Sequence, residues 1–329
     1  MKEVFAPHLG RNVKFGRKRP IAVGPRMKLR NYLRANLPTP PTSADYSAAA
    51  KVPLANIYEN DTLGDCVIAG GYHITGVETG NATGKAFEAT SAQIIADYSA
   101  IGGYKPGDPS TDQGCDENTA LDYWQNHGFA DGTKILGSLV VDASNWNEVQ
   151  AAMYLFENLV ICMELPDAYV DPFPSGSGFT WDVAGAPVPD NGHSICGVAY
   201  GPAGVTVCTW AMLGLLTKAA LAKYAVTSAG GSLNVILTPD QIAKAAVKAP
   251  NGVAWADLIA DFDSLGGHVP SPAPAPTPVP PPPVAGGVSL AQAEAAVKQV
   301  VGSGPVIISR TAAVTAATKA LASLKGWPT

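Results

Sequence analysis

The stretch Asn60-Asp-Thr-Leu-Gly-Asp-Cys66-Val-Ile-Ala-Gly70 decides how this sequence folds. Cys66 follows Gly64 and Asp65 and opens an apolar run, which predicts a loop that ends in the first turn of a buried helix. Asp65 is the candidate N-cap of that helix. A thiol in this place faces unpaired backbone N–H groups and the positive end of the helix dipole, and both favour the thiolate. The stretch therefore predicts a nucleophilic cysteine.

A thiolate nucleophile needs a base, and His193 is the candidate. This histidine begins an apolar, strand-like run that continues to Gly201, so we expect its imidazole on a rigid sheet. His193 follows Cys66 by 127 residues, which is close to the separation of nucleophile and base in one group of cysteine peptidases.

Four blocks in the same order make the chain resemble papain-like cysteine peptidases, from about residue 55 to about residue 240. Gly64-Asp65-Cys66 stands where that family has Gly-Ser-Cys, and Asn60 stands where it has the glutamine of the oxyanion hole. The other blocks are Ser91-Ala-Gln-Ile-Ile-Ala-Asp97, Gly114-Cys-Asp-Glu-Asn-Thr-Ala-Leu121 with His127-Gly-Phe129, and Gly192-His193 to Tyr200-Gly201. The Leu-Gly-Asp-Cys variant is similar to that of uncharacterised phage and bacterial proteins.

The resemblance implies an α+β, papain-like fold of two lobes, one helical and one an antiparallel sheet, with a cleft that brings Cys66 to His193. It also implies catalytic roles for Cys66, His193 and the oxyanion donor Asn60, and a peptide or protein substrate. The family's orienting asparagine is absent. Alignment on the tryptophan of that motif places Cys208 there, whereas counting from His193 places Thr209 there.

Early helices followed by strands also predict an α+β protein from pattern alone. Thr90 with Gln93 forms a capping-box signal for one of the helices. The predicted helices begin near Cys66, Ser91, Asp116, Asn145 and Leu215, and the predicted strands cover residues 159–165, 193–200, 205–210 and 233–237.

The chain divides by composition into four segments: a basic N-terminal arm (1–45), the papain-like domain (46–268), a Pro-rich linker (269–287) and a small helical tail (288–329). The linker carries nine prolines between Pro270 and Pro283 and is expected to form a semi-rigid spacer. The tail is too short to bury a large core alone, so it suits docking on a protein partner or self-association.

The arm is the most basic part of a chain whose net charge is −5, because residues 1–34 hold ten of the 22 Lys and Arg and only one acid, Glu3. Two interpretations stay open. The arm docks on an acidic partner or on nucleic acid, or it lies over the chain's own globular domain.

The compartment follows from the cysteines and from targeting signals. Five cysteines are an odd number, and the usual disulfide mates of the family are replaced, which indicates a reducing cytoplasm. The N-terminus has no apolar segment of a secretory signal, and no stretch approaches the ~20 apolar residues of a membrane span. We therefore expect a cytoplasmic or virion-associated protein.

Several other residues have two interpretations. Trp210 either shields the base from water or is an ordinary core tryptophan. His73 is expected to pack on the nucleophile helix without reaching the thiol, and Cys162 and Cys196 are expected to be inert core residues. No phosphate-binding loop and no His/Cys cluster with zinc spacing is visible in the sequence, so no cofactor and no metal is predicted.

Two functions remain possible. In the first, the chain is a thiol hydrolase or peptidase that cleaves an amide bond with the pair Cys66 and His193. In the second, it is a catalytically weak or inactive papain-like fold that serves as a structural or binding component, such as one of a phage particle. The missing asparagine favours the second function, and the retained pair favours the first.

Overall fold

The computed structural model describes residues 2–20, 26–33, 39–239, 257, 258 and 260. All of them lie in one compact unit, Met1–Pro272. The predicted Pro-rich linker and helical tail lie outside the described residues. No helix in the described part of the chain combines the length and the hydrophobicity that crossing a bilayer requires.

The first half of the domain is helical, as predicted. Its helices are α1 (Lys51–Leu54), α2 (Cys66–Thr83), α3 (Ser91–Gly102) and α4 (Glu117–Asn126). The predicted capping box at Thr90 and Gln93 is present at α3, and the Asp116 side chain accepts from the backbone N–H of Thr119 at α4. These side chains fix where both helices begin, because they satisfy donors that the first turn leaves free.

The second half supplies an eight-stranded sheet. Along it the order is β6 (Gly137–Val140), β12 (Ser232–Leu237), β7 (Leu159–Glu164), β9 (Gly192–Gly201), β10 (Gly204–Thr209), β11 (Met212–Thr217) and β8 (Thr180–Trp181), while β4 (Ala44–Asp45) also pairs with β9. All of these pairings are antiparallel except that of β11 with β8. Helices α5 (Trp146–Phe156) and α6 (Lys218–Tyr224) lie within this half. Short 3₁₀ turns cover Leu29–Asn31, Ala48–Ala50, Pro109–Thr111, Asp167–Tyr169, Pro189–Asn191 and Thr227–Ala229.

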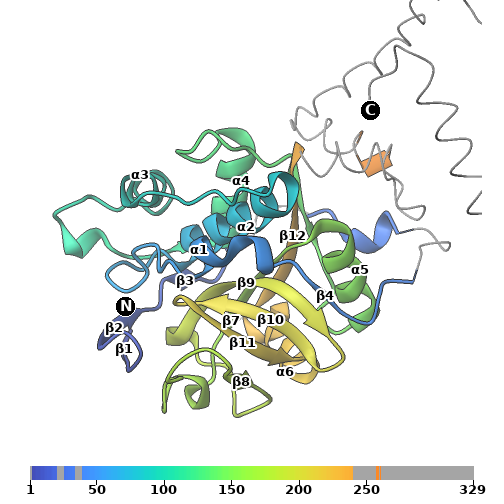
Figure 1. The fold of residues 1–329 in the computed structure, drawn as a ribbon. Helices are drawn as coiled ribbons and strands as arrows, with labels where there is room; N and C mark the ends of the chain where they lie inside the picture. The colour runs from blue at the N-terminus through green and yellow to red at the C-terminus, as the bar shows by residue number, and fades with distance from the viewer. Residues whose placement is uncertain (1, 21–25, 34–38, 240–256, 259, 261–329) are drawn as a thin grey trace, which may run out of the picture. The chain divides into compact units, whose positions relative to one another are not determined.

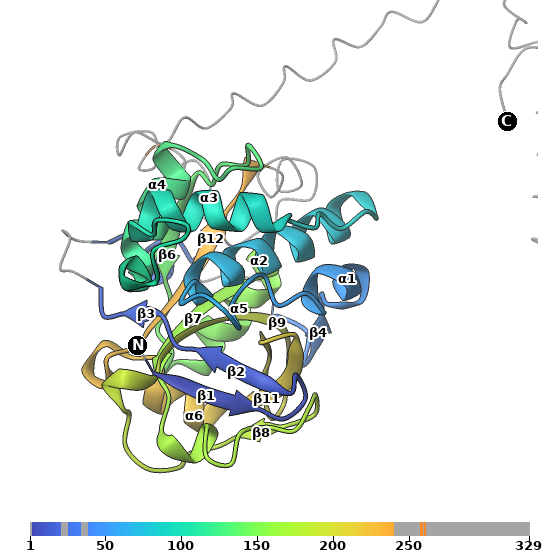
Figure 2. The same cartoon turned by 90° about the vertical axis from the view of Figure 1, so that its left-hand side faces the viewer.

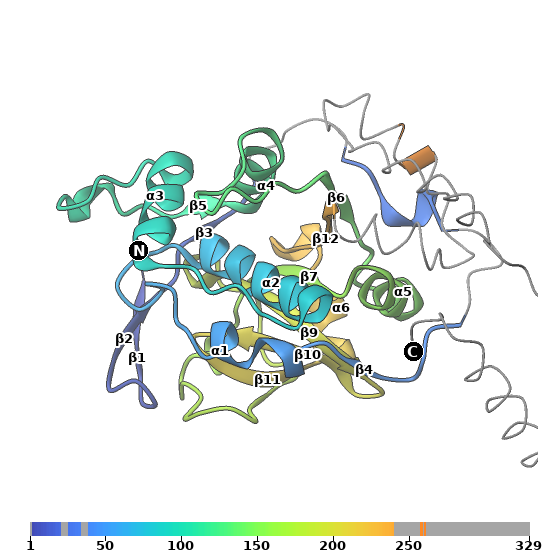
Figure 3. The same cartoon turned by 45° about the horizontal axis from the view of Figure 1, so that its top comes forward.

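The alternation of side chains along the strands divides the core into two layers. Cys162, Cys196 and Cys208 face α2 and the other helices of the first half. Their neighbours Ile161 and Ile195 face the opposite layer, which α5, α6 and part of the arm cover. Figures 1 and 3 show α2 lying across the sheet at β9 and β7. The sheet is thus buried on both faces, and α2 is the helix that joins the two halves.

One predicted helix is partly wrong. Residues from Leu215 were expected to be helical, but Leu215–Thr217 end strand β11, and α6 begins at Lys218. The strand forms because Met212–Thr217 pairs in full register with β10 across a tight turn. Tertiary pairing thereby outweighs the weak helical preference of the leucines. The short strands of the arm were not predicted from the sequence. Strands β6, β8 and β11 of the large sheet were not predicted either.

The N-terminal arm lies on the domain, which agrees with one of the two interpretations of its sequence. Strands β1 (Glu3–Ala6) and β2 (Arg11–Lys14) form a hairpin, and β3 (Arg17–Lys18) pairs with β5 (Cys115–Asp116) of the helical half. Figure 2 shows the hairpin in front of the sheet half and β3 between it and helices α3 and α4.

Most of the described arm cations pair with carboxylates of this same chain. Seven of the nine described basic residues in 1–34 form ion pairs with the domain. The pairs are Lys2–Asp167, Arg11–Asp61, Lys14–Asp112, Arg17–Glu117, Arg19–Glu164, Arg26–Asp122 and Arg30–Asp142. Most of these pairs keep one partner partly exposed, but both side chains of Arg17–Glu117 are 0% exposed.

The Arg17–Glu117 pair is bidentate. Arg17 Nε and Nη2 each donate to a Glu117 carboxylate oxygen at 2.9 Å, and Arg17 Nη1 also donates to the carbonyl of Gly230. Two charges without solvent contact need this number of hydrogen bonds to offset the cost of removing them from water. The pair therefore fixes the arm at one point.

Removing one partner of this pair is expected to destabilise the fold strongly. Arg17→Met leaves the Glu117 charge buried without its partner, and the free energy of unfolding should fall by about 3–5 kcal/mol. Urea unfolding measures it. The double variant Arg17→Met/Glu117→Leu should recover most of that loss, whereas Lys2→Ala, at an exposed pair, should change stability by less than about 1 kcal/mol. If Arg17→Met and Lys2→Ala lower the free energy of unfolding equally, Arg17–Glu117 is not the strongly coupled, buried pair described above.

Candidate active site

Cys66 is the first residue of α2, where the sequence placed it, and only 1% of its surface is exposed. The backbone N–H groups of Ser194 and Gly16 are directed at its thiol. Burial nevertheless raises the pKa of the thiol to about 12. Asp65 is the N-cap residue, as predicted, but its side chain makes no capping hydrogen bond. The helix end favours a thiolate, but in this state desolvation outweighs it.

His193 lies at the start of β9 and is also 1% exposed. Its Nε2 is 2.7 Å from Thr209 Oγ1, and its Nδ1 is buried with no hydrogen-bond partner among the described residues. Thr209, and not Cys208, therefore takes the place of the orienting asparagine. The Cys208 thiol faces elsewhere and donates to the carbonyl of Leu54 at 3.4 Å.

Trp210 stacks on the imidazole of His193, with ring centroids 3.8 Å apart and an interplanar angle of 9°. It stands in the two-residue turn between β10 and β11, where Trp210 and Ala211 have φ of 45° and 61°. Positive φ at both residues is the conformation that tight hairpin turns need, although it is unfavourable for bulky side chains. The turn thus holds the indole over the histidine, in agreement with the shielding interpretation.

Two consecutive residues of the arm touch both members of the predicted pair. The ring of Phe15 packs edge-on against His193, with centroids 5.8 Å apart, and against Trp210 at 5.3 Å. The next residue, Gly16, directs its N–H at Cys66. These contacts place both residues beneath the arm. Among the described residues the buried Nδ1 of His193 has no hydrogen-bond partner, so the action of Cys66 and His193 as a pair stays a prediction.

Gly16 fits because it has no side chain. Its carbonyl accepts from Cys115 N at 3.0 Å, and a Cβ on Gly16 would lie 1.7 Å from the carbonyl oxygen of Gly64. Arg17, the next residue, is held by Glu117. The arm backbone consequently runs in direct contact with the backbone that precedes the nucleophile.

Asp112 ties the arm to the nucleophile loop from the other side. Its Oδ1 accepts from the backbone N–H of Gly64 at 3.0 Å and from the Tyr98 hydroxyl at 2.6 Å, and its Oδ2 accepts from Lys14 Nζ at 2.9 Å. A carboxylate with these partners fixes Gly64 and Lys14 in one network. No local pattern in the sequence predicted this role of Asp112.

Asn60, the predicted oxyanion donor, is buried beside the site, with 3% of its surface exposed. Its Nδ2 donates to the Leu63 carbonyl at 3.3 Å. In this state the amide shapes the loop before Cys66, and its role toward an oxyanion stays a prediction.

A pocket of about 440 Å³ lies at the arm and is lined by Lys2, Phe15, Gly16, Arg17, Lys18, Gln113 and Asp190. Neither Cys66 nor His193 is among its lining residues. The arm thus separates the pair from this hollow.

Burial acts on both members of the pair. It lowers the pKa of His193 to about 3 and, as stated, raises that of Cys66 to about 12. Between these values the thiol and the imidazole are both neutral. Proton transfer from Cys66 to His193 is then unfavourable while the arm is in place.

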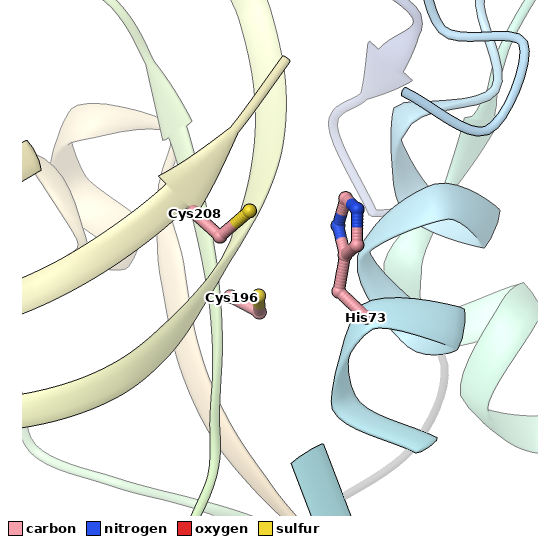
Figure 4. Close-up of side chains that lie close together, drawn as sticks. All are labelled: His73, Cys196 and Cys208. Carbon is pink, nitrogen blue, oxygen red and sulfur yellow. The ribbon is translucent and has the colours of Figure 1, made fainter. Parts of the chain in front are cut away.

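The remaining candidates form a second group. His73 was expected to pack without reaching Cys66, and its Nε2 donates to the Asn56 carbonyl at 2.9 Å. The structure also places His73 beside Cys196 and Cys208, with ligand atoms within 4.8 Å of one another (Figure 4). No zinc-like spacing was visible in the sequence, because His73 lies on α2 and the two cysteines lie on β9 and β10, far from it along the chain. All five cysteines are free and buried.

Solved structures with the same arrangement of helices and sheet identify the fold. Xylellain, a cysteine protease from Xylella fastidiosa, is similar with a TM-score of 0.50 and 12% identity, over 69% of this chain and 96% of that chain. The fold is papain-like.

Two further structures have lower scores than xylellain. Procathepsin L 3 of the Tenebrio molitor larval midgut has a TM-score of 0.46 and 13% identity, over 64% of this chain and 76% of that chain. The Carica candamarcensis cysteine protease CMS1MS2 has a TM-score of 0.43 and 15% identity, over 60% of this chain and 99% of that chain. No family model matches the sequence, and no curated protein matches it. The similarity to xylellain shows the papain-like fold, and it shows neither the phage branch nor the activity.

The buried His193 is expected to make stability depend on pH. An unfolded histidine has a pKa of about 6.5, whereas burial lowers that of His193 to about 3. Between these values only the unfolded chain binds the proton. The free energy of unfolding should therefore fall as pH decreases from 6.5 toward 3, by at most about 5 kcal/mol from this group.

Urea unfolding of the wild type and of His193→Gln at several pH values between 4 and 7 measures this contribution. The difference between the two proteins isolates His193 from the other titrating groups. The wild type should lose more stability on acidification than the variant. Parallel pH profiles contradict a neutral, buried His193.

Proposed function

We propose that this chain is a papain-like thiol hydrolase that cleaves an amide bond with Cys66 and His193, and that its arm holds the pair in a covered, latent state. The observation that carries the proposal is the contact of Phe15 with His193 and of Gly16 with Cys66. Adjacent residues of an extended segment occupy the place that a substrate backbone needs. The papain-like fold supports a peptide or protein substrate.

The residues of the pair have complementary roles in this proposal. With Nε2–H of His193 donating to Thr209 Oγ1, Nδ1 carries the lone pair that a base needs. Nδ1 takes the proton of the Cys66 thiol, and the thiolate attacks the substrate carbonyl carbon to form a tetrahedral intermediate. His193 then gives the proton to the leaving amine, and water hydrolyses the thioester.

The oxyanion of that intermediate needs donors. The backbone N–H of Cys66, at the positive end of α2, is one, and Asn60 is the proposed second once its amide leaves the Leu63 carbonyl. Loss of one such donor typically costs about 100- to 1000-fold in rate. A poorly placed Asn60 therefore makes a slow enzyme.

A second candidate rests on a specific observation. Thr209 offers one hydroxyl where the family has an amide, and the thiol is sealed. Both features fit a fold without turnover that acts as a structural or binding component, such as one of a phage particle.

Displacing the arm is expected to activate the thiol. Gly16→Ala adds a Cβ that would lie 1.7 Å from the Gly64 carbonyl oxygen, so the segment must shift. Water then reaches Cys66, and the pKa of its thiol falls. Each pKa unit of this decrease raises the thiolate fraction at neutral pH about tenfold. Alkylation by iodoacetamide, located by peptide mass spectrometry, should accelerate at Cys66 by at least about tenfold.

Gly176→Ala is the matched control, because a Cβ at Gly176 meets nothing within 4 Å. This variant should leave the rate of Cys66 alkylation unchanged. Phe15→Ala provides a second route to the same opening if Gly16→Ala folds poorly. Unchanged alkylation of Cys66 in both folded arm variants contradicts the proposal that the arm covers the site.

Turnover is the decisive test of the hydrolase. Full-length Gly16→Ala should cleave casein or a cell-wall peptide, because the opened pair reaches a carbonyl. Adding Cys66→Ala should abolish cleavage, and adding His193→Ala should lower it by at least about 100-fold. Cleavage that survives Cys66→Ala, or fast alkylation without any cleavage, contradicts the hydrolase, and the latter outcome favours the binding component.

A further inference from the structure

A second cluster of chemically active side chains lies away from the Cys66–His193 site. His73 of α2, Cys196 of β9 and Cys208 of β10 are all buried, and one ligand atom of each lies within 4.8 Å of the others. Cys196 and Cys208 stand opposite each other in the register of the two antiparallel strands. Figure 4 shows both sulfurs on the side of the sheet that faces His73. Two sulfurs and an imidazole thus converge on one point between the helix and the sheet.

The orientation of His73 is that of a metal ligand. The Asn56 carbonyl can only accept, so Nε2 carries a proton and donates to it at 2.9 Å. Figure 4 shows one ring nitrogen on the side of the two sulfurs, and with Nε2 engaged this nitrogen is Nδ1. A backbone carbonyl that holds the non-ligating nitrogen is the usual device for fixing a metal-binding histidine.

A backbone oxygen lies beside the thiols. The Cys208 thiol donates to the Leu54 carbonyl oxygen at 3.4 Å. This oxygen is a fourth donor at the edge of the cluster.

We propose that His73, Cys196 and Cys208 form a structural Zn²⁺ site that clamps α2 to the β9–β10 hairpin, with the Leu54 carbonyl oxygen at the fourth position.

Charge and geometry select the metal. Two thiolates and Zn²⁺ sum to zero, which a site without solvent requires, whereas Cu⁺ with two thiolates leaves a buried negative charge. Zn–S distances of about 2.3 Å and Zn–N distances of about 2.0 Å place tetrahedral donors about 3.3–3.8 Å apart. The cluster needs to contract by only about 1 Å, which side-chain rotation supplies.

The position of the site gives it a consequence. His73 lies seven residues after Cys66 on the same helix, and Cys208 precedes Thr209. Zn²⁺ would hold the nucleophile's helix against the two strands that carry His193 and its partner. The site nonetheless stands independently of the proposed hydrolase, because none of its ligands belongs to the catalytic pair.

The test is metal content of the full chain, purified under reducing conditions in metal-depleted buffers after expression with added zinc. Inductively coupled plasma mass spectrometry should find about one Zn²⁺ per chain. Cys196→Ala and Cys208→Ala should lose it. Cys162→Ala is the matched control, since Cys162 is equally buried and lies on the same face of the sheet, and it should keep its zinc. Cys66→Ala should also keep it, which separates this site from the proposed active site.

A second measurement uses the wild type, so that it does not depend on variants that fold poorly. Co²⁺ exchanged into the chain should give thiolate-to-cobalt charge-transfer absorption, and removing the metal with a chelator should lower the melting temperature. A folded wild type that holds no zinc and gives no cobalt–thiolate absorption overturns the proposal. So does zinc retained in Cys208→Ala, or a disulfide between Cys196 and Cys208 in the protein purified under reducing conditions.

Discussion

The buried pair of Arg17 and Glu117 is the constraint on which the state of this molecule depends. Neither side chain has solvent contact, and the guanidinium uses two nitrogens on the carboxylate and a third on the Gly230 carbonyl. An isolated charge in that place would be very costly, so the two groups remain together. Because Arg17 directly follows Phe15 and Gly16, the pair also holds these residues over His193 and Cys66. One ion pair therefore couples the stability of the fold to the closure of its site.

The charge distribution of the chain has the same physical meaning. The basic arm and the acidic remainder are two halves of an intramolecular contact, and seven ion pairs join them. Exposed pairs such as Lys2–Asp167 add little stability each. Together they orient the arm, and the buried pair with the Gly16 contact supplies its position. These contacts agree with the interpretation that the arm lies over its own domain, whereas an acidic partner of the arm stays a prediction.

Helix α2 carries residues of both proposed sites. Its first residue is Cys66, and His73 faces the two thiols of β9 and β10. Strand β10 ends in Thr209, and the turn with Trp210 follows it; both residues contact His193, which lies at the start of β9. A shift of α2 relative to these strands would disturb both the proposed catalytic pair and the proposed zinc ligands. The helix–sheet contact thus sets the geometry of two sites at once.

The sequence by itself determined the α+β class and most of the elements, and it supplied Cys66 and His193 as candidates whose catalytic role stays a prediction. These depend on local signals: the capping box at Thr90, the cysteine at a helix start and the apolar run after His193 are all visible within a few residues. Tertiary structure decided the rest. The strand at Met212–Thr217 needs its partner β10, and the choice of Thr209 over Cys208 depends on which way a strand faces.

The covering arm and the His73–Cys196–Cys208 cluster could not be predicted from any local sequence pattern. Each joins segments separated by roughly a hundred residues or more, and their geometry exists only once the chain has folded. Burial, which moves the pKa values of Cys66 and His193 in opposite directions, is likewise a property of the packed molecule. Residue types fix what chemistry is available, and packing decides which groups meet and whether water reaches them.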